Sequence, residues 1–293
     1  MKKIAIAAAT GNIGKRAAQK IASGNATAIL LGQNLERMNR LAIKGAIPTV
    51  TDLSDPGQMI AATQDADALF LLVPPVTRLP SLKEWYQRVT AAGIAAVTEN
   101  KIKRVVLISS LGATTAADLG TVSYCGRMEA AFDELDAHVL ALRPGYFMEN
   151  FLQQAAEIKN EGKFSFPFPD DHDIPWVSTD DIGDAAARYL LDETWAGHWK
   201  LNLMGPENIT LAEAAERLAV LTNRPVEYVR QSVEDLTAQF SSWGIPGHIQ
   251  HELLALYKAL GDPDGVYATP RTPEAVTPTD FEQFIKRKLL KTT

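Results

Sequence analysis

The sequence predicts an α/β fold built on a parallel sheet. Short apolar runs alternate with helical patterns through the first half of the chain, which is typical of consecutive β-α-β units. At 293 residues and 46% hydrophobic, the chain is long enough to bury such a sheet under helices on both faces. The runs that we interpret as strands cover residues 4–8, 28–31, 47–50, 68–73, 105–109 and 139–142.

Capping residues mark the helices between these strands. A helix over 15–22 follows a turn that contains glycines. Pro56, directly after Asp55, stands at a favoured first helical position. Ser81 and Glu84 have the spacing of a capping box in front of apolar residues at helical spacing. The spacing therefore predicts a helix in each of these three crossovers.

The second half of the chain is less regular at first. Prolines flank an acidic loop over 170–173, which we expect to be a surface connection between two parts of the molecule. Helices and a strand then return. The expected elements are a helix over 179–191 capped by Ser178 or Thr179, a capping box at Thr210 and Glu213 opening a helix that ends near Asn223, a strand over 226–229, and a third capping box at Thr279 and Glu282 before a basic helix end.

Composition excludes several classes of function. The chain has 29 Lys and Arg against 35 Asp and Glu, a net charge of −6, which argues against direct binding of nucleic acid. Its single cysteine, Cys125, allows no internal disulfide and suits a reducing compartment, so we expect a cytoplasmic protein. The apolar run after Lys3 ends at Thr10, which is too short for a signal sequence or a membrane span.

The turn after the first strand has the clearest chemistry. In Ala8-Ala9-Thr10-Gly11-Asn12-Ile13-Gly14, Gly11 is free to take a positive φ and lets backbone N–H groups approach a pyrophosphate at the positive end of the following helix. Gly14 permits close packing of the helix on the strand. Thr10, Gly11, Asn12, Ile13 and Gly14 are therefore candidate dinucleotide-binding residues. A purely structural tight turn is the alternative, since Ala8 stands at the usual first glycine.

The same turn resembles the opening motif of the NmrA-like family of atypical short-chain dehydrogenases. Other matching motifs follow in order: Asp52-Leu53, 71–75, 106–110, 143–150, 181–183, 202–207 and 244–246. The resemblance implies a Rossmann-type NAD(P)-binding domain over 1–150 with helices on both faces. It also implies a smaller C-terminal α/β subdomain over 151–293 that binds substrate, from which about 176–204 returns to the sheet.

The resemblance also implies a set of cofactor-binding residues beyond the first turn. They are Gln33, Asn34, Asp52, Leu53, Val73, Pro74, Pro75, Ser109, Ser110, Pro144, Gly145, Tyr146 and Phe147. Asp52 would bond the adenine amine, or it is a helix cap. The prolines and serines would line the cofactor at the carboxyl ends of strands, or they simply end those strands. The rings of Tyr146 and Phe147 would stack on a flat acceptor, or they belong to the core.

The choice between NAD and NADP depends on the end of the second strand. Family members usually carry an arginine near Gly32, which this chain lacks. Gln33 and Asn34 suit either cofactor. Arg37 and Arg40 are either solvated charges or ligands of a 2′-phosphate, and we favour NADP slightly over NAD.

No catalytic residue is evident. Classical short-chain dehydrogenases use a tyrosine and a lysine four residues later, but here Met128 follows Tyr124 at that spacing. Aligning Glu129 with the family's glutamate places Cys125 at the lysine position. Cys125 is either a reactive thiol or a small buried apolar residue, and Arg127 on the same helix is a possible cation beside it. The histidines are scattered and predict no metal site.

Two functions are compatible with these residues. The first is an oxidoreductase that transfers a hydride from NAD(P)H to a small flat acceptor such as a quinone or azo compound, because the C-terminal half looks most similar to quinone, azo-dye and triphenylmethane reductases. The second is a non-catalytic NmrA-like redox sensor that binds NAD(P) and acts through a regulatory protein partner. A homodimer is compatible with both.

Overall fold

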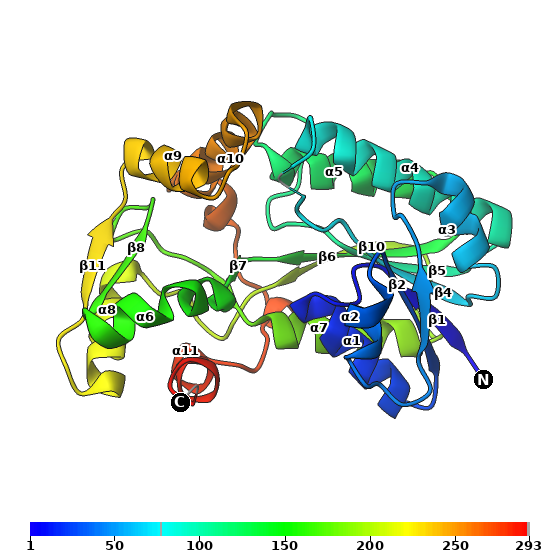
Figure 1. Ribbon diagram of the computed structural model, residues 1–293, viewed down its shortest axis with the longest axis horizontal. Coiled ribbons are helices and arrows are strands. Elements are labelled where there is room, and N and C mark those ends of the chain that lie inside the picture. The colour runs from blue at the N-terminus through cyan, green and yellow to red at the C-terminus, as the bar shows by residue number, and fades with distance from the viewer. Residues whose placement is uncertain (77, 292–293) are drawn as a thin grey trace.

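The computed structural model describes residues 1–76 and 78–291. In these residues a parallel sheet of seven strands crosses one half of the molecule, with the order β10-β6-β5-β4-β1-β2-β3 (Figure 1). Each neighbouring pair in this sheet is parallel, which confirms the predicted α/β class. The strands are β1 (Lys3–Ile6), β2 (Thr27–Gly32), β3 (Ile47–Val50), β4 (Ala68–Leu72), β5 (Arg104–Ile108), β6 (His138–Pro144) and β10 (His198–Leu203).

Helices cover both faces of the sheet, as the alternation along β1 requires. Ile4 and Ile6 point into one apolar core and Ala5 into the other, because successive strand residues face opposite ways. The first core lies under α1 (Asn12–Ser23), α2 (Leu35–Asn39) and α7 (Thr179–Leu191). The second lies under α3 (Pro56–Ala62), α4 (Leu82–Asn100) and α5 (Thr121–Phe132) (Figure 1).

A smaller lobe at the carboxyl end of the sheet has its own core, built largely from aromatic rings. Phe151, Phe164 and Trp176 are among its fully or almost fully buried side chains. Two small parallel pairs, β8 with β11 and β7 with β9, belong to it. Its elements are β7 (Tyr146–Phe147), η1 (Met148–Gln154), α6 (Ala155–Asn160), β8 (Lys163–Phe166), β9 (Trp176–Val177), α8 (Leu211–Thr222), β11 (Glu227–Arg230), α9 (Val233–Ser242), α10 (Gly247–Leu260), η2 (Val266–Ala268), η3 (Pro273–Ala275), α11 (Phe281–Phe284) and η4 (Ile285–Leu289).

The chain returns from this lobe to the main sheet through α7 and β10. β10 pairs with β6 in parallel from His198 opposite Val139 to Leu203 opposite Pro144. The division of the chain near residue 150 stays a prediction. In the described ranges, no helix is long and apolar enough to cross a membrane.

Several predicted boundaries were wrong for local reasons. β1 ends at Ile6 because Ala8 takes φ 52°, which a strand cannot contain, and α1 begins at Asn12 rather than Lys15. The final helix is capped by Asp280, since the Thr279 hydroxyl donates instead to Asp181.

Other local predictions are confirmed. Asp55, Ser178 and Thr210 cap α3, α7 and α8, and Thr210 forms the full capping box with Glu213. At Ser81 only half of the predicted capping box is confirmed: the hydroxyl accepts the Glu84 N–H at 3.3 Å. The acidic loop lies at the surface except for its histidine: the His172 side chain is buried, with Nε2 2.7 Å from the Leu260 carbonyl oxygen.

Candidate functional site

The predicted site residues follow the carboxyl ends of parallel strands, which all lie at one edge of the sheet. Between β1 and β4 the strand order reverses direction, and open α/β sheets bind ligands at such a point. The predicted residues follow β1 (Thr10–Gly14), β2 (Gln33, Asn34), β3 (Asp52, Leu53), β4 (Val73, Pro74, Pro75), β5 (Ser109, Ser110) and β6 (Gly145, Tyr146, Phe147), and Pro144 is the last residue of β6.

The turn between β1 and α1 differs from its prediction in one detail. Gly11 is the N-cap of α1 with φ −79° and ψ 168°, and Ala8 carries the positive φ instead. The Gly11 N–H donates to the Ala8 carbonyl at 3.0 Å, which closes the turn. A Cβ at Gly14 would lie 2.5 Å from that same carbonyl oxygen, so Gly14 is required for packing, as predicted.

The first turn of α1 is open to a ligand. Gly11 offers no side chain to accept the first N–H groups of the helix, and Thr10, Gly11 and Asn12 are exposed. A Cβ at Gly11 would lie 3.4 Å from the Ala8 carbonyl oxygen, and beyond its chain neighbours and its own helix it would meet no other atom of the described residues within 4 Å. Backbone N–H groups and the helix dipole suit a pyrophosphate at this position.

After β2, two polar side chains precede α2 and two arginines follow: Gln33 and Asn34 lie before the helix, Arg37 lies in it, and Arg40 is its C-cap. The Asn34 side chain caps the helix by accepting the Arg37 N–H at 2.9 Å, and Gln33 is exposed. Arg40 is bonded to Glu36 one turn away. The exposed Arg37 side chain has no such partner among the described residues, so Arg37 is the arginine available to an anion.

The ends of β3 and β4 contribute mainly backbone and apolar groups. Asp52 does not cap α3, because Asp55 does; its carboxylate accepts the Ser54 N–H at 2.9 Å and the Ser54 hydroxyl at 2.8 Å. Leu53 and Val73 are buried, and Pro75 is exposed. The carbonyl of Pro74 accepts the indole N–H of Trp85 at 2.8 Å, which fixes the segment after β4 against α4.

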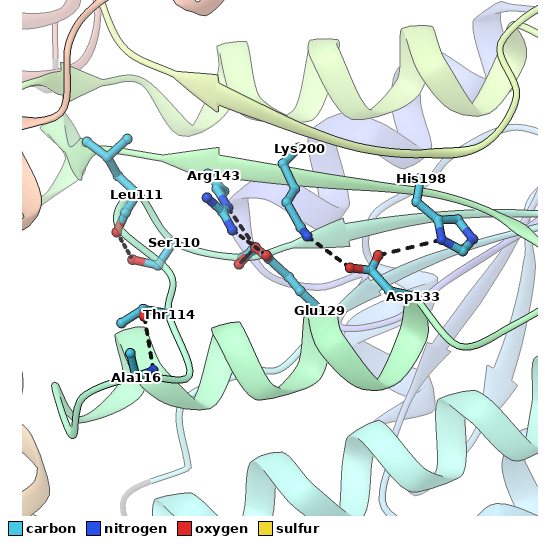
Figure 2. A network of polar contacts seen from close by, with 10 residues as sticks. Ser110, Leu111, Thr114, Ala116, Glu129, Asp133, Arg143, His198 and Lys200 are labelled. Atoms are coloured by element: carbon cyan, nitrogen blue, oxygen red, sulfur yellow. Dashed lines mark hydrogen bonds and ion pairs between the residues drawn. The ribbon is translucent and has the colours of Figure 1, made fainter.

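The ends of β5 and β6 are joined by a buried ionic network (Figure 2). Glu129 on α5 accepts Arg143 Nε at 2.9 Å and Arg143 Nη2 at 2.6 Å. The Ser109 hydroxyl donates to the same carboxylate, and the Ser110 hydroxyl donates to the Leu111 carbonyl. The sequence indicates for Glu129 only a likeness to the family's glutamate. Its partners in the structure are Arg143 of β6 and Ser109, directly after β5.

The segment after β6 enters the smaller lobe. Gly145 is required by a close approach, because a Cβ there would lie 2.1 Å from the Pro175 carbonyl oxygen. The Tyr146 ring is buried, and Phe147 is half-buried. Of the two interpretations of Tyr146, its surroundings favour a core ring: the neighbouring rings, at centroid distances of 5.2 to 6.3 Å, are Phe166, Phe168, Trp176 and Tyr267.

Tyr124 and Cys125, the two candidates for proton transfer, are a hydrogen-bonded phenol and a buried thiol. The Tyr124 hydroxyl donates to Glu252 of α10 at 2.8 Å, and burial together with this bond raises the pKa of Tyr124 above its usual value. Burial, with the nearby charge of Glu129, raises the pKa of the Cys125 thiol to about 12, so it is neutral near pH 7. Arg127 lies over the Tyr124 ring at 5.8 Å.

The sequence analysis did not identify Glu252, because no local sequence pattern marks it. Its carboxylate also accepts the Leu82 N–H at 3.0 Å and the Lys83 N–H at 2.9 Å, at the first turn of α4. One side chain of α10 therefore binds the first turn of α4. Its partners lie 128, 169 and 170 residues away in the sequence.

No group of three or more His, Cys, Asp or Glu side chains within residues 1–76 and 78–291 is placed to hold a metal ion. His248, one of the two helix histidines, has its Nε2 3.2 Å from the Leu79 carbonyl oxygen. Two hollows, of about 420 and 330 Å³, lie elsewhere: one beside α6, the other between the start of α7 and the C-terminal segment with α11 and η4.

Known proteins share this architecture over almost the whole chain. An NAD(P)H azoreductase from Xenophilus azovorans is 25% identical over 276 residues, which are 94% of this chain and 92% of that protein. The crystal structure of an NADPH-dependent quinone oxidoreductase from Escherichia coli complexed with NADPH has a TM-score of 0.77 at 22% identity, covering 97% of this chain and 99% of that one.

A regulator has the same fold. The crystal structure of NmrA, a negative transcriptional regulator, in complex with NADP has a TM-score of 0.73 at 18% identity and covers 99% of this chain and 91% of that one. At these identities the two crystal structures establish the fold alone. The sequence model of the NmrA-like family, however, matches residues 1–285, and the chain therefore belongs to the NmrA-like family.

Proposed function

We propose that this protein is an NAD(P)H-dependent oxidoreductase that transfers a hydride to a small flat acceptor such as a quinone or an azo compound. The observation that carries the proposal is the open first turn of α1 at the switch point of the sheet, with Gly11 leaving room for a pyrophosphate. The azoreductase relative, which matches over 94% of this chain, supports the choice of acceptor.

The chain's own residues would bind the dinucleotide in an extended form along the sheet edge. The N–H groups after Gly11 would hold the pyrophosphate, and Asp52 would lie near the adenine. The unpartnered Arg37 favours the 2′-phosphate of NADP over the hydroxyl of NAD. Pro74 and the segment from Pro144 would frame the nicotinamide. When bound, the dinucleotide would supply the hydride.

Proton supply does not require a side chain for these acceptors. The Cys125 thiol is buried with a pKa of about 12, and Tyr124 is bonded to Glu252, so neither is placed as an acid near neutral pH. Reduced quinones and azo compounds take their protons from water. The protein's contribution is then to place the acceptor against the nicotinamide.

The second candidate is a non-catalytic sensor of NAD(P) redox state that acts through a protein partner. The absence of a tyrosine and lysine pair at the classical spacing favours it, and a regulator shares the fold. We favour the reductase because the azoreductase matches both lobes, including the C-terminal lobe that would contact an acceptor.

One experiment separates these functions. NADPH and NADH are titrated against the protein by nicotinamide fluorescence, and quinones and azo dyes are then added while oxidation is followed by nicotinamide absorbance. Binding with oxidation that depends on the acceptor supports the reductase. Binding without turnover on the whole panel favours the sensor, and no binding of either nucleotide refutes both.

A further inference from the structure

A single buried carboxylate joins three elements at the edge of the proposed site. Glu129 of α5 has 3% of its side chain exposed and forms a fork of two bonds with Arg143 of β6, at 2.9 and 2.6 Å. It also accepts the hydroxyl of Ser109, the first residue after β5. Figure 2 shows Glu129 reaching from the helix toward Arg143 on the strand above it.

The backbone around this carboxylate continues the pairing of β5 and β6 beyond the end of β5. The Ser109 N–H donates to the Leu142 carbonyl at 2.8 Å, and the Leu111 N–H donates to the Pro144 carbonyl at 2.9 Å. The segments held together in this way contain Ser109 and Pro144, which belong to the proposed nicotinamide end of the site. Glu129 thus fixes both segments from beneath.

Stability alone is a poor explanation for this network. A buried ion pair is usually no more stabilising than apolar side chains of the same volume, because both charges lose their hydration. Such a network does restrict geometry, since the planar guanidinium accepts only one relative placement of helix and strand. The neighbouring Cys125 thiol is neutral, as its pKa of about 12 indicates, so it does not compete for Arg143.

We propose that Glu129 is a positioning residue for the nicotinamide end of the bound dinucleotide: through Ser109 and Arg143 it holds the ends of β5 and β6 as one rigid edge. This inference rests on the proposed binding of NAD(P)H. Hydride transfer needs the reacting groups placed to within roughly 0.5 Å, so an edge that moves would slow transfer without affecting the distant pyrophosphate cradle.

The test uses variants that loosen the edge to different extents. S109A removes one bond to Glu129, and R143K keeps the charge but not the fork. Removing one partner alone would leave a buried charge and could unfold the chain, so E129M/R143L replaces both charges together. The matched control is D133N/K200M, which removes the Asp133–Lys200 pair (2.9 Å) from the next turn of the same helix (Figure 2).

Three readouts separate positioning from general stability. They are the Kd of 2′,5′-ADP, which lacks the nicotinamide, the fluorescence of bound NADPH, and kcat and KM with a quinone. We expect all variants to bind 2′,5′-ADP within about twofold of the wild type. S109A, R143K and E129M/R143L should lose at least about half of the fluorescence enhancement and on the order of tenfold in kcat, with KM changed much less.

Each outcome decides the inference. Unchanged NADPH fluorescence in S109A and E129M/R143L overturns it and leaves the proposed function intact. A loss of 2′,5′-ADP binding as large as the loss of NADPH binding would show a merely structural role and also overturn it. The same follows if D133N/K200M behaves like the other variants. A wild type that binds no nucleotide refutes the proposed function and this inference with it.

Discussion

Valine at residue 11 tests the pyrophosphate cradle with little effect on the fold. Gly11 has φ −79° and ψ 168°, an extended conformation that valine adopts, and its Cβ would lie 3.4 Å from the nearest protein atom. Valine is a poorer helix N-cap by roughly 1 kcal/mol, but it restricts the unfolded chain by about 0.4–1 kcal/mol. These effects nearly cancel, so the free energy of unfolding should change by less than about 1 kcal/mol.

The same side chain would occupy the space of the pyrophosphate. Losing two charge-assisted N–H bonds of about 1.5 kcal/mol each removes roughly 3 kcal/mol, which is about a 100-fold increase in the Kd of NADPH. Fluorescence titration measures this Kd, and thermal unfolding followed by circular dichroism measures stability. G11V with the wild-type Kd would refute the cradle.

G14A is the matched contrast. A Cβ at Gly14 would lie 2.5 Å from the Ala8 carbonyl oxygen and 3.0 Å from Ala9 Cα, so backbone must move. We expect a loss of about 1–3 kcal/mol of stability, which corresponds to about 2–4 °C in Tm for each kcal/mol. An unchanged Tm would contradict the packing argument.

Three further changes test separate parts of the structure. A8G relieves a left-handed residue at φ 52° and should stabilise the protein by up to about 1 kcal/mol in urea denaturation; a destabilised A8G would count against that conformation. R37A should raise the Kd of NADPH at least about tenfold by calorimetry, leave NADH within about twofold, and exceed the effect of R40A; equal effects of the two variants would remove Arg37 from the cofactor site. Burial raises the pKa of Glu149 above its ordinary value of 4.5, so the native state holds the carboxyl proton more tightly than the unfolded chain does. The stability of the wild type should therefore fall as the pH rises from 4.5 through the raised pKa. E149Q should remove this fall in denaturation midpoints measured from about pH 4 to 8, and a pH profile identical to that of the wild type would contradict the argument.

Much of the fold was predictable because its signals are local. The apolar runs that became β1 to β6 need only a few residues each, since a buried parallel strand is apolar on both faces. Caps such as Asp55 and Thr210 bond an N–H three residues away, so the sequence alone locates them. The chain order of motifs was sufficient to identify the family.

The site was predictable only in part. Gly14 was correctly predicted as a packing residue, because in this motif the helix packs closely on the end of the preceding strand at that position. The prediction for Gly11 was wrong, because Ala8 and not Gly11 carries the positive φ of this turn. The hydrogen-bond partners of Glu252 and Glu129 could not be predicted either, because they lie on other elements of the fold.

The sequence by itself determined the α/β class and the order of the first six strands, because each depends on periodicity or on bonds within a few residues. The place of the phosphate-binding turn stays a prediction. Only the tertiary structure decided that Tyr146 is a core ring, that Cys125 is a neutral buried thiol, and that Glu129 joins β6 to the residue after β5. Burial and long-range bonding depend on which elements meet, and that is fixed only when the whole chain packs.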